Sequence, residues 1–241
     1  MIAIIAATNH ELKYFLQYTG IQELKTVNGV QIAELTFSGK AFIVAISGVG
    51  IKRARAAADL LAGKYDLSLI ISAGFCGSLK QQLTPGDAVI PSWVEKADSE
   101  NGKYILYNDI FRNGSCKSNG GVISSNRFIN SSIHKKLLAG KTHTSCVDME
   151  TWSVASCAER RGIPVAGLRV ITDGFHTDLP DMQKIYTREQ RLSRTRSFKY
   201  FSMNPKLLLP FLKFYYFDLD RASRSLNESL LSMINELPEG F

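Results

Sequence analysis

TSCVDMETWSVASCAERRGIPVAGLRVITD, residues 144–173, has the pattern of a strand, a helix and a second strand. Thr144–Val147 is predicted as the first strand, because it is short and apolar and ends at an acidic turn. Met149–Arg161 is predicted as a helix that ends at Gly162, since glycine commonly follows the last helical residue. Pro164–Ile171 is rich in β-branched and apolar residues, which favours the second strand. This unit indicates an α/β protein.

The same alternation of strands and helices continues on the N-terminal side of this unit. Val30–Phe37 and Ala41–Ser47 flank Ser38-Gly39-Lys40 and are predicted to form a β-hairpin. Four further strands are expected at Ile2–Ala7, Leu67–Ala73, Asp87–Trp93 and Val122–Ser124. Three helices are expected at Glu11–Tyr18, Ile51–Gly63 and Asn126–Ala139. This order predicts a mixed, largely parallel sheet with helices on both faces, in a single domain over residues 1–241.

Two parts of the chain depart from this alternation. Residues 98–120 are polar and rich in Gly and Asn, and we expect them to be the least structured. The C-terminal third is predicted to be helical, with breaks at Pro205 and Pro210 and an amphipathic segment near Leu219–Leu237.

The composition is that of a folded globular protein: 45% of the 241 residues are hydrophobic and 21% are charged. The four cysteines form no C-x-x-C pair and have no histidine at metal-ligand spacing, which predicts reduced thiols and no metal site. The apolar N-terminus lacks a basic region, and no apolar run approaches the ~20 residues that span a bilayer. We therefore expect a cytoplasmic protein.

Candidate functional residues follow the predicted strands, where ligands bind in sheets of this class. The segments are Thr8–Glu11, Ser47–Gly50, Gly74–Ser78, Val147–Glu150 and Arg169–Gly174. Structural explanations remain open for each: glycine turns are common packing devices, acids can stabilise a helix N-terminus, and Arg169 with Asp173 can form an ion pair.

Gly48-Val49-Gly50 is a bare G-x-G followed by Arg53, where a dinucleotide fingerprint has glycine. No dinucleotide or other cofactor is predicted.

Five segments in order resemble the purine nucleoside phosphorylase and nucleosidase superfamily, over residues 1 to about 182. They are SGVG (47–50), SAGFCGSL (72–79), LTPGDAVI (83–90), VDMET (147–151) and RVITD (169–173). The resemblance implies a nucleoside phosphorylase-like fold, a homo-oligomer, a purine nucleoside as the small-molecule substrate, and no metal or redox cofactor.

The resemblance also implies roles at the purine and the sugar. Asp173 would protonate the leaving purine, and Thr172 would help to place it. Glu150 would bind both ribose hydroxyls and favour positive charge at C1′, with Met149 under the sugar. Phe128 would stack on the purine with Ile129 beside it; an ordinary core position is the alternative for Phe128.

The nucleophile is left open between water and phosphate. Glu11 lies where the hydrolytic branch of the superfamily has the glutamate that activates water, and no arginine precedes Arg53. Gly48, Gly74, Phe75 and Arg169 would also line the substrate. Phe75 replaces a small residue of the nucleosidases, which should reshape the nucleophile pocket or the 5′ pocket, and Trp152 replaces another small residue.

The segments DGFHTDLP (173–180), NPKLLLPFLK (204–213) and RASRSL (221–226) resemble hopanoid-biosynthesis-associated phosphorylase-like proteins. The expected substrate is then a 5′-modified adenosine such as adenosylhopane. A methylthioadenosine/S-adenosylhomocysteine nucleosidase and a non-catalytic storage or sensor member of the fold are the alternatives.

The net charge is +7, and much of it lies in one run. Six cations occur within sixteen residues: Lys184, Arg188, Arg191, Arg194, Arg196 and Lys199. No aromatic-interleaved reader motif accompanies them, so nucleic acid is not an expected partner. The apolar segment 205–217 follows, and core packing or a subunit interface is one explanation for it. The other is a peripheral contact with the anionic inner face of the membrane.

Overall fold

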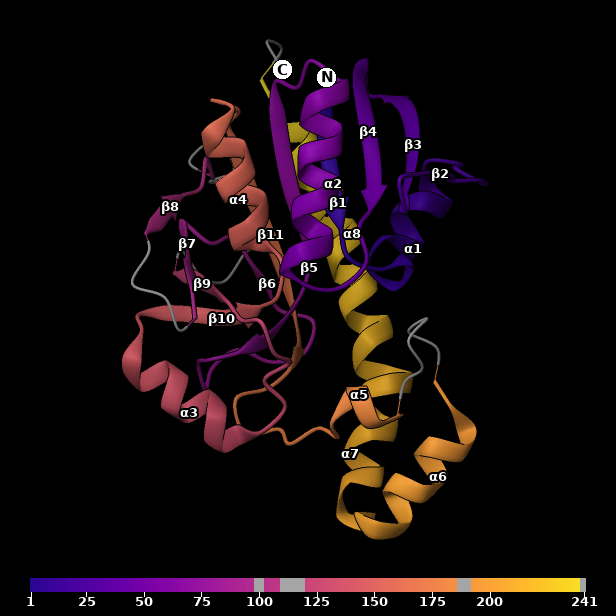
Figure 1. Ribbon diagram of the computed structural model, residues 1–241, viewed down its shortest axis with the longest axis vertical. Coiled ribbons are helices and arrows are strands. Elements are labelled where there is room, and N and C mark those ends of the chain that lie inside the picture. Colours follow the sequence, from indigo (N-terminus) through magenta and orange to yellow (C-terminus); the bar gives the residue numbers. More distant parts are fainter. Residues whose placement is uncertain (98–101, 109–119, 186–191, 239–241) are drawn as a thin grey trace.

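The computed structural model describes residues 1–97, 102–108, 120–185 and 192–238 (Figure 1). Its strands form one mixed sheet in the order β2-β3-β4-β1-β5-β10-β9-β7-β8, and β11 pairs with β5 and β6. The strands are β1 (Ile2–Ala6), β2 (Lys25–Val27), β3 (Val30–Phe37), β4 (Lys40–Ile46), β5 (Leu69–Ser78), β6 (Ala88–Val89), β7 (Trp93–Lys96), β8 (Lys103–Ile105), β9 (Gly121–Ser124), β10 (Thr144–Asp148) and β11 (Val165–Asp173).

The centre of the sheet is parallel. β1 lies parallel to β4 and β5, and β11 lies parallel to β5 from Val165 to Asp173. Antiparallel pairs occur at the hairpin β3–β4, at the outer strands and where β10 meets β5. The predicted α/β class with a mixed sheet is confirmed. Because β1, β4 and β11 run in the same direction, their carboxyl ends bring the predicted segments to one edge.

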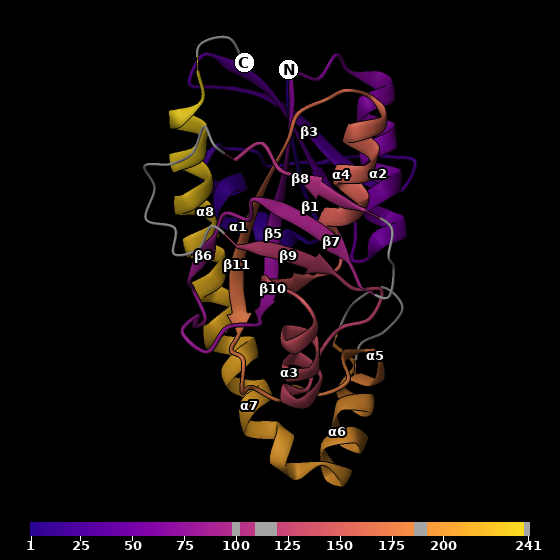
Figure 2. The ribbon, with the colours of Figure 1, turned by 90° about the vertical axis from the view of Figure 1, so that its left-hand side faces the viewer.

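Helices cover both faces of this sheet, and alternate residues of β1 pack against the two layers. Ala3 and Ile5 face a core that includes α2 (Ile51–Lys64) and α4 (Thr151–Arg160). Ile2 and Ile4 face a second core with α1 (Asn9–Tyr18) and α8 (Leu219–Glu236). A strand with apolar residues at every position is typical of this two-sided burial. Figure 2 shows α2 and α4 on the side opposite α8.

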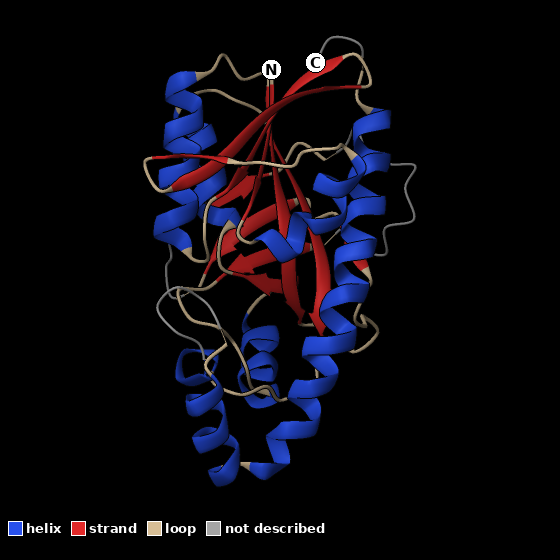
Figure 3. Cartoon of the chain, turned by 90° about the vertical axis from the view of Figure 1, so that its right-hand side faces the viewer, coloured by secondary structure: helices blue, strands red, loops and turns tan. Residues whose placement is uncertain are grey.

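The remaining helices build a projection at the end of the molecule away from the termini (Figure 3). It contains α5 (Met182–Ile185), α6 (Arg194–Met203), a 3₁₀ turn (Pro205–Leu207), α7 (Leu208–Lys213) and a π-helical segment (Phe214–Asp218) that continues into α8. A small core of its own fills it, made of Leu179, Ile185, Phe201, Phe211 and Phe214. Helix α3 (Ser132–Lys141) lies nearby, between β9 and β10 in the chain.

Several boundaries differ from the sequence-based prediction. The glycine-rich segment 74–78 belongs to β5, because its pairing with β11 and β10 continues past Ala73. The predicted strand Asp87–Trp93 is two strands, β6 and β7, separated at Pro91, which lacks a backbone N–H for the ladder. Helix α3 begins at Ser132, because the Ser131 side chain caps it.

The two prolines of the C-terminal third behave differently. Pro205 follows the end of α6, as predicted. Pro210 lies within the first turn of α7 and does not break it, since a proline there removes no intrahelical bond. Most of the polar segment 98–120, as well as Arg188 and Arg191, lies outside the described residues.

Candidate active site

Glu11 lies on the first turn of α1, and its carboxylate connects the ends of β1 and β5. Oε2 accepts hydrogen bonds from the backbone N–H groups of Ala7 and Thr8, both at 2.7 Å. Oε1 accepts from Phe75 N–H at 2.9 Å. Thr8 caps the helix and forms a capping box with Glu11, which fixes the start of α1. This carboxyl group is therefore held in place by three backbone donors.

Gly74 allows strand β5 to pass close to the Glu11 carboxylate. A Cβ atom on Gly74 would lie 2.7 Å from Glu11 Oε1, closer than van der Waals contact permits. The glycine predicted to line the site thus has a definite structural reason: strand β5 passes directly against the carboxylate.

Glu150 lies between β10 and α4, opposite the glycine turn after β4. Its Oε1 accepts from Gly50 N–H at 2.7 Å, and its Oε2 accepts from Met149 N–H at 3.2 Å. Gly50 has a φ of 105°, which favours glycine and directs this N–H at the carboxylate. Ser153 Oγ donates to the Glu150 carbonyl at 2.8 Å and anchors its backbone.

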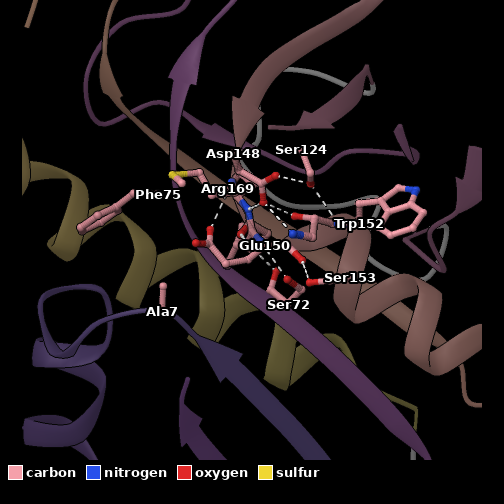
Figure 4. A network of polar contacts seen from close by, with 12 residues as sticks. Ala7, Ser72, Phe75, Ser124, Asp148, Glu150, Trp152, Ser153 and Arg169 are labelled. Carbon is pink, nitrogen blue, oxygen red and sulfur yellow. Dashed lines mark hydrogen bonds and ion pairs between the residues drawn. The ribbon is translucent and has the colours of Figure 1, made fainter. Parts of the chain in front are cut away.

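A buried ion pair lies near Glu150 (Figure 4), and the charge of Arg169 acts on both glutamates. Arg169 Nε donates to Asp148 Oδ2 at 2.8 Å, and its other nitrogens bind Ser72 and the Leu168 carbonyl. Asp148 also accepts from the Thr151 N–H and hydroxyl and from the Ser124 hydroxyl. The alternative of an ion pair between Arg169 and Asp173 is therefore wrong: Arg169 pairs with Asp148, and Asp173 pairs with Lys135.

The two glutamates share one electrostatic environment. Burial of the carboxyl group, with the negative charges of Asp148 and Glu11, raises the pKa of Glu150 to about 8. Burial also raises the pKa of Glu11, although the backbone donors Phe75 and Thr8 and the Arg169 charge oppose the rise. Two neighbouring carboxyl groups with raised pKa values are typical of sites that bind polar groups or transfer protons.

Asp173 ends β11 and lies farther along β5, beside Gly77. Its Oδ1 accepts from the Thr172 hydroxyl at 2.8 Å, and its Oδ2 forms an ion pair with Lys135 of α3. A Cβ atom on Gly77 would meet Oδ2 at 3.1 Å. The Thr172 hydroxyl thus contacts the Asp173 carboxylate. Lys135 was not predicted, because no local pattern distinguishes it from the exposed Lys136.

The other predicted residues lie around this centre. Phe75 gives its backbone N–H to Glu11, while its ring points away from Glu150 and packs against the core beneath α1 and α8 (Figure 4). Trp152 also points away, and its ring packs against Tyr104. Gly48 has a φ of 82°, and the Arg53 side chain lies over it.

Phe128 and Ile129 line a cavity of about 1320 Å³, together with Lys96 of β7 and with His134 and Lys141 of α3. Within the described part of the chain, none of Glu11, Glu150 and Asp173 lines this cavity. Phe128 also packs against the small core of the C-terminal projection.

The chain was compared with known protein families. A family model, described as the phosphorylase superfamily, matches residues 1–198. The chain belongs to the phosphorylase superfamily.

Relatives within the phosphorylase superfamily give the match more detail. A 5′-methylthioadenosine/S-adenosylhomocysteine nucleosidase of Shewanella halifaxensis is 25% identical over 203 residues, covering 74% of this chain and 88% of the relative. A Helicobacter pylori nucleosidase of the same name, solved with butyl-thio-DADMe-Immucillin-A, has a TM-score of 0.75 at 20% identity and covers 98% of each chain. Futalosine hydrolase of Helicobacter pylori has a TM-score of 0.75 at 18% identity, covering 98% and 97%.

Among the described residues, no three His, Cys, Asp or Glu side chains are grouped so that they could hold a metal ion. No helix in the described ranges is long and apolar enough to cross a membrane.

Proposed function

We propose that this protein cleaves the N-glycosidic bond of an adenine nucleoside and releases adenine. One observation carries the proposal: Glu11 and Glu150 are held by backbone N–H groups at the same edge of the sheet where β11 ends in Asp173. The mechanism needs a base for the nucleophile, a carboxylate at the sugar hydroxyls and an acid for the leaving group. In our proposal Glu11, Glu150 and Asp173 fill these roles, within one domain over residues 1–241.

Water is the proposed nucleophile. A carboxyl group with a raised pKa can accept a proton from water near neutral pH, and Glu11 has such a group. Phosphate is the second candidate, because the Arg53 side chain lies against Gly48 at the end of β4. Phosphate would need this cation, whereas water would not.

The proposed substrate carries a modified 5′ carbon, and adenosylhopane is the leading candidate. Support comes from the loop after Asp173: its Leu179 packs into the small core of the C-terminal projection, which joins this apolar element to the loop that carries the acid. A methylthioadenosine/S-adenosylhomocysteine nucleosidase is the alternative, supported by the names of the relatives.

The test incubates the purified protein with methylthioadenosine, adenosine and adenosylhopane, each with and without phosphate, and measures free adenine. Hydrolysis predicts release that is independent of phosphate. Asp173→Asn should lose at least ~10²-fold in rate, the usual contribution of a general acid. Absence of adenine release from all three substrates would contradict the proposed function and favour a binding role.

A peripheral membrane contact, a cytoplasmic location and a homo-oligomer are further proposals. The C-terminal projection supports the first: seven of the thirteen exposed large apolar side chains among the described residues lie between residues 198 and 217. They are Phe198, Met203, Leu208, Leu209, Leu212, Tyr216 and Phe217. Residues 192–217 also contain five cations and no acid, which suits an anionic lipid surface.

A further inference from the structure

Lys135 is a fully buried lysine with three partners, all in the segment that carries the proposed acid. Its ammonium forms an ion pair with Asp173 Oδ2 and donates to the Gly174 carbonyl at 2.7 Å and the Thr177 carbonyl at 3.4 Å. Its side chain has an exposed fraction of 0%. A lysine is rarely buried unless it is paired, so these three contacts are what allow the Lys135 ammonium to lie in the interior.

The position of α3 places the Lys135 ammonium next to Asp173. Ser131 caps the helix, and the Ser132 N–H donates to Asp178 at 2.6 Å. Asn130 and Leu179 exchange two further hydrogen bonds just before the helix. The loop after β11 is thereby tied to the start of α3, and Lys135, on the first turn, points at Asp173.

Asp173 itself has almost no access to solvent. Its side chain has an exposed fraction of 2%, and Gly77 of β5 closes one side of the carboxyl group. In the described part of the chain, two side chains donate to it, the Thr172 hydroxyl and the Lys135 ammonium. An ammonium releases a proton far more readily than an aliphatic hydroxyl, so Lys135 is the nearby group that can supply one.

We propose that Lys135 is a positioning residue that stores the proton which Asp173 transfers to the leaving base. This inference rests on the proposed function. In the resting pair the proton is on nitrogen and the carboxylate is ionised. As the C1′–N bond breaks and its electron pair moves to the base, the Nζ–H bond breaks and an O–H bond forms on Asp173. The carboxylic acid then gives this proton to the base.

The step balances with the rest of the reaction. Water forms the bond to C1′ and loses a proton to Glu11, while lysine is left as a neutral amine. After the products leave, Glu11 releases its proton to solvent, and Lys135 regains one through Asp173. The net reaction consumes one nucleoside and one water.

A purely architectural role for Lys135, linking α3 to the loop at Gly174, is the competing explanation. The leaving group distinguishes the two. A purine must be protonated to leave, whereas 4-nitrophenolate leaves as a stable anion without a proton. A proton-storing lysine therefore matters for a purine riboside and not for a 4-nitrophenyl riboside, whereas a misplaced loop would slow both.

The experiment compares Lys135→Met with Lys136→Met, an exposed neighbour on the same helix, on both substrates. Lys135→Met should lower kcat for the purine riboside by ~10²-fold or more, with KM changed less than about threefold, and should leave 4-nitrophenyl riboside cleavage within about fivefold. Lys136→Met should match the wild type on both. Asp173→Asn should show the same selectivity, and the double variant should be no slower than Asp173→Asn alone.

Thermal unfolding checks that each variant is folded. If Lys135→Met alone is unstable, because Asp173 is then buried without a partner, the double variant removes that charge and is compared with Asp173→Asn. Equal losses on both substrates, unchanged purine cleavage in Lys135→Met, or a double variant much slower than Asp173→Asn would overturn the proposal. Slow Asp173→Asn with normal Lys135→Met would leave the proposed function intact.

Discussion

The neighbours of Glu150 determine both the position of its carboxyl group and the free-energy cost of ionising it. It is held by the N–H groups of Gly50 and Met149 and lies near the charges of Asp148 and Glu11. These neighbours place a carboxyl group where a sugar with two adjacent hydroxyls could be bound. The same neighbours make the charged form costly, which has consequences for both selectivity and stability.

The first prediction concerns selectivity for ribose. If Glu150 binds the 2′- and 3′-hydroxyls, 2′-deoxy substrates should react poorly with the wild type. Above pH 8, where the Glu150 carboxyl group is ionised, Glu150→Gln should lower kcat/KM for ribosides by about 10- to 100-fold, since a charged hydrogen bond contributes ~1.5–3 kcal/mol. It should change deoxyribosides much less.

Glu159→Gln is the matched control, because Glu159 is exposed on α4 and should have no effect. Steady-state kinetics on both series measure the ratio. Equal losses on ribosides and deoxyribosides would show that Glu150 only supports the structure.

The second prediction concerns pH. Between the ordinary carboxyl value of 4.5 and about 8, the unfolded chain has released the Glu150 proton while the folded protein retains it. The unfolded state then binds fewer protons, so this group lowers the free energy of unfolding as the pH rises through the window. Glu150→Gln, which cannot ionise, should melt at a higher temperature than the wild type at pH 8 and at a similar one near pH 5. An advantage that grows toward low pH would contradict this sign.

At the scale of single elements, strand β5 is the part on which the site depends. It pairs with β1, β10 and β11 and passes both proposed catalytic carboxyl groups, Glu11 at Gly74 and Asp173 at Gly77. A strand can approach a side chain this closely only where it has no Cβ. The glycines of this segment therefore serve contact between strand and carboxylate within the sheet, rather than a turn.

The third prediction follows from Gly74. Gly74→Ala should destabilise the protein by ~1–3 kcal/mol, because its methyl group would lie 2.7 Å from Glu11 Oε1, closer than van der Waals contact permits. The displaced carboxylate should also lose the Phe75 hydrogen bond, and activity should fall by an order of magnitude or more.

Gly140→Ala on α3 provides the control, since no atom lies within 4 Å of its Cβ position and the change should be neutral or slightly stabilising. Denaturant unfolding and adenine release measure the two effects. Wild-type behaviour of Gly74→Ala would mean that the strand and the carboxylate are not in close contact.

For the whole molecule, the fourth prediction concerns the C-terminal projection. The elements that carry its exposed apolar side chains and cations lie at the end of the molecule away from the termini (Figures 1 and 3). A symmetric contact between two copies of this surface would place cations against cations, whereas an anionic membrane would attract them. Vesicles with phosphatidylglycerol should therefore bind the protein at low salt, and added salt should release it.

Two triple variants with equal net charge test the location of this binding. Arg194→Glu, Lys199→Glu and Lys206→Glu together should abolish co-sedimentation. Lys25→Glu, Lys52→Glu and Lys64→Glu, all on exposed residues outside the projection, should retain most of it. No binding of the wild type would rule out the membrane contact. A dimer that only the first triple variant dissociates would identify a subunit interface instead.

The sequence by itself determined the sheet, its two covering layers and most of the segments at its carboxyl edge. Each depends on local information: apolar runs for β1 and β11, the turn at Ser38 and Gly39, and glycine at the end of α4. The segment around Glu11 was located because loops that follow parallel strands meet at one edge of a sheet, whereas Glu150 reaches this edge from β10, which is antiparallel to β5.

Only the tertiary structure decided which of these residues touch. Lys135 became the partner of Asp173, while Ile133 and Leu137 on the same helix remain 67% and 58% exposed. The helical pattern alone would bury the apolar residues and expose the lysine. Burial of a charge depends on a partner distant in the chain, here 38 residues away, and no local pattern records that partner.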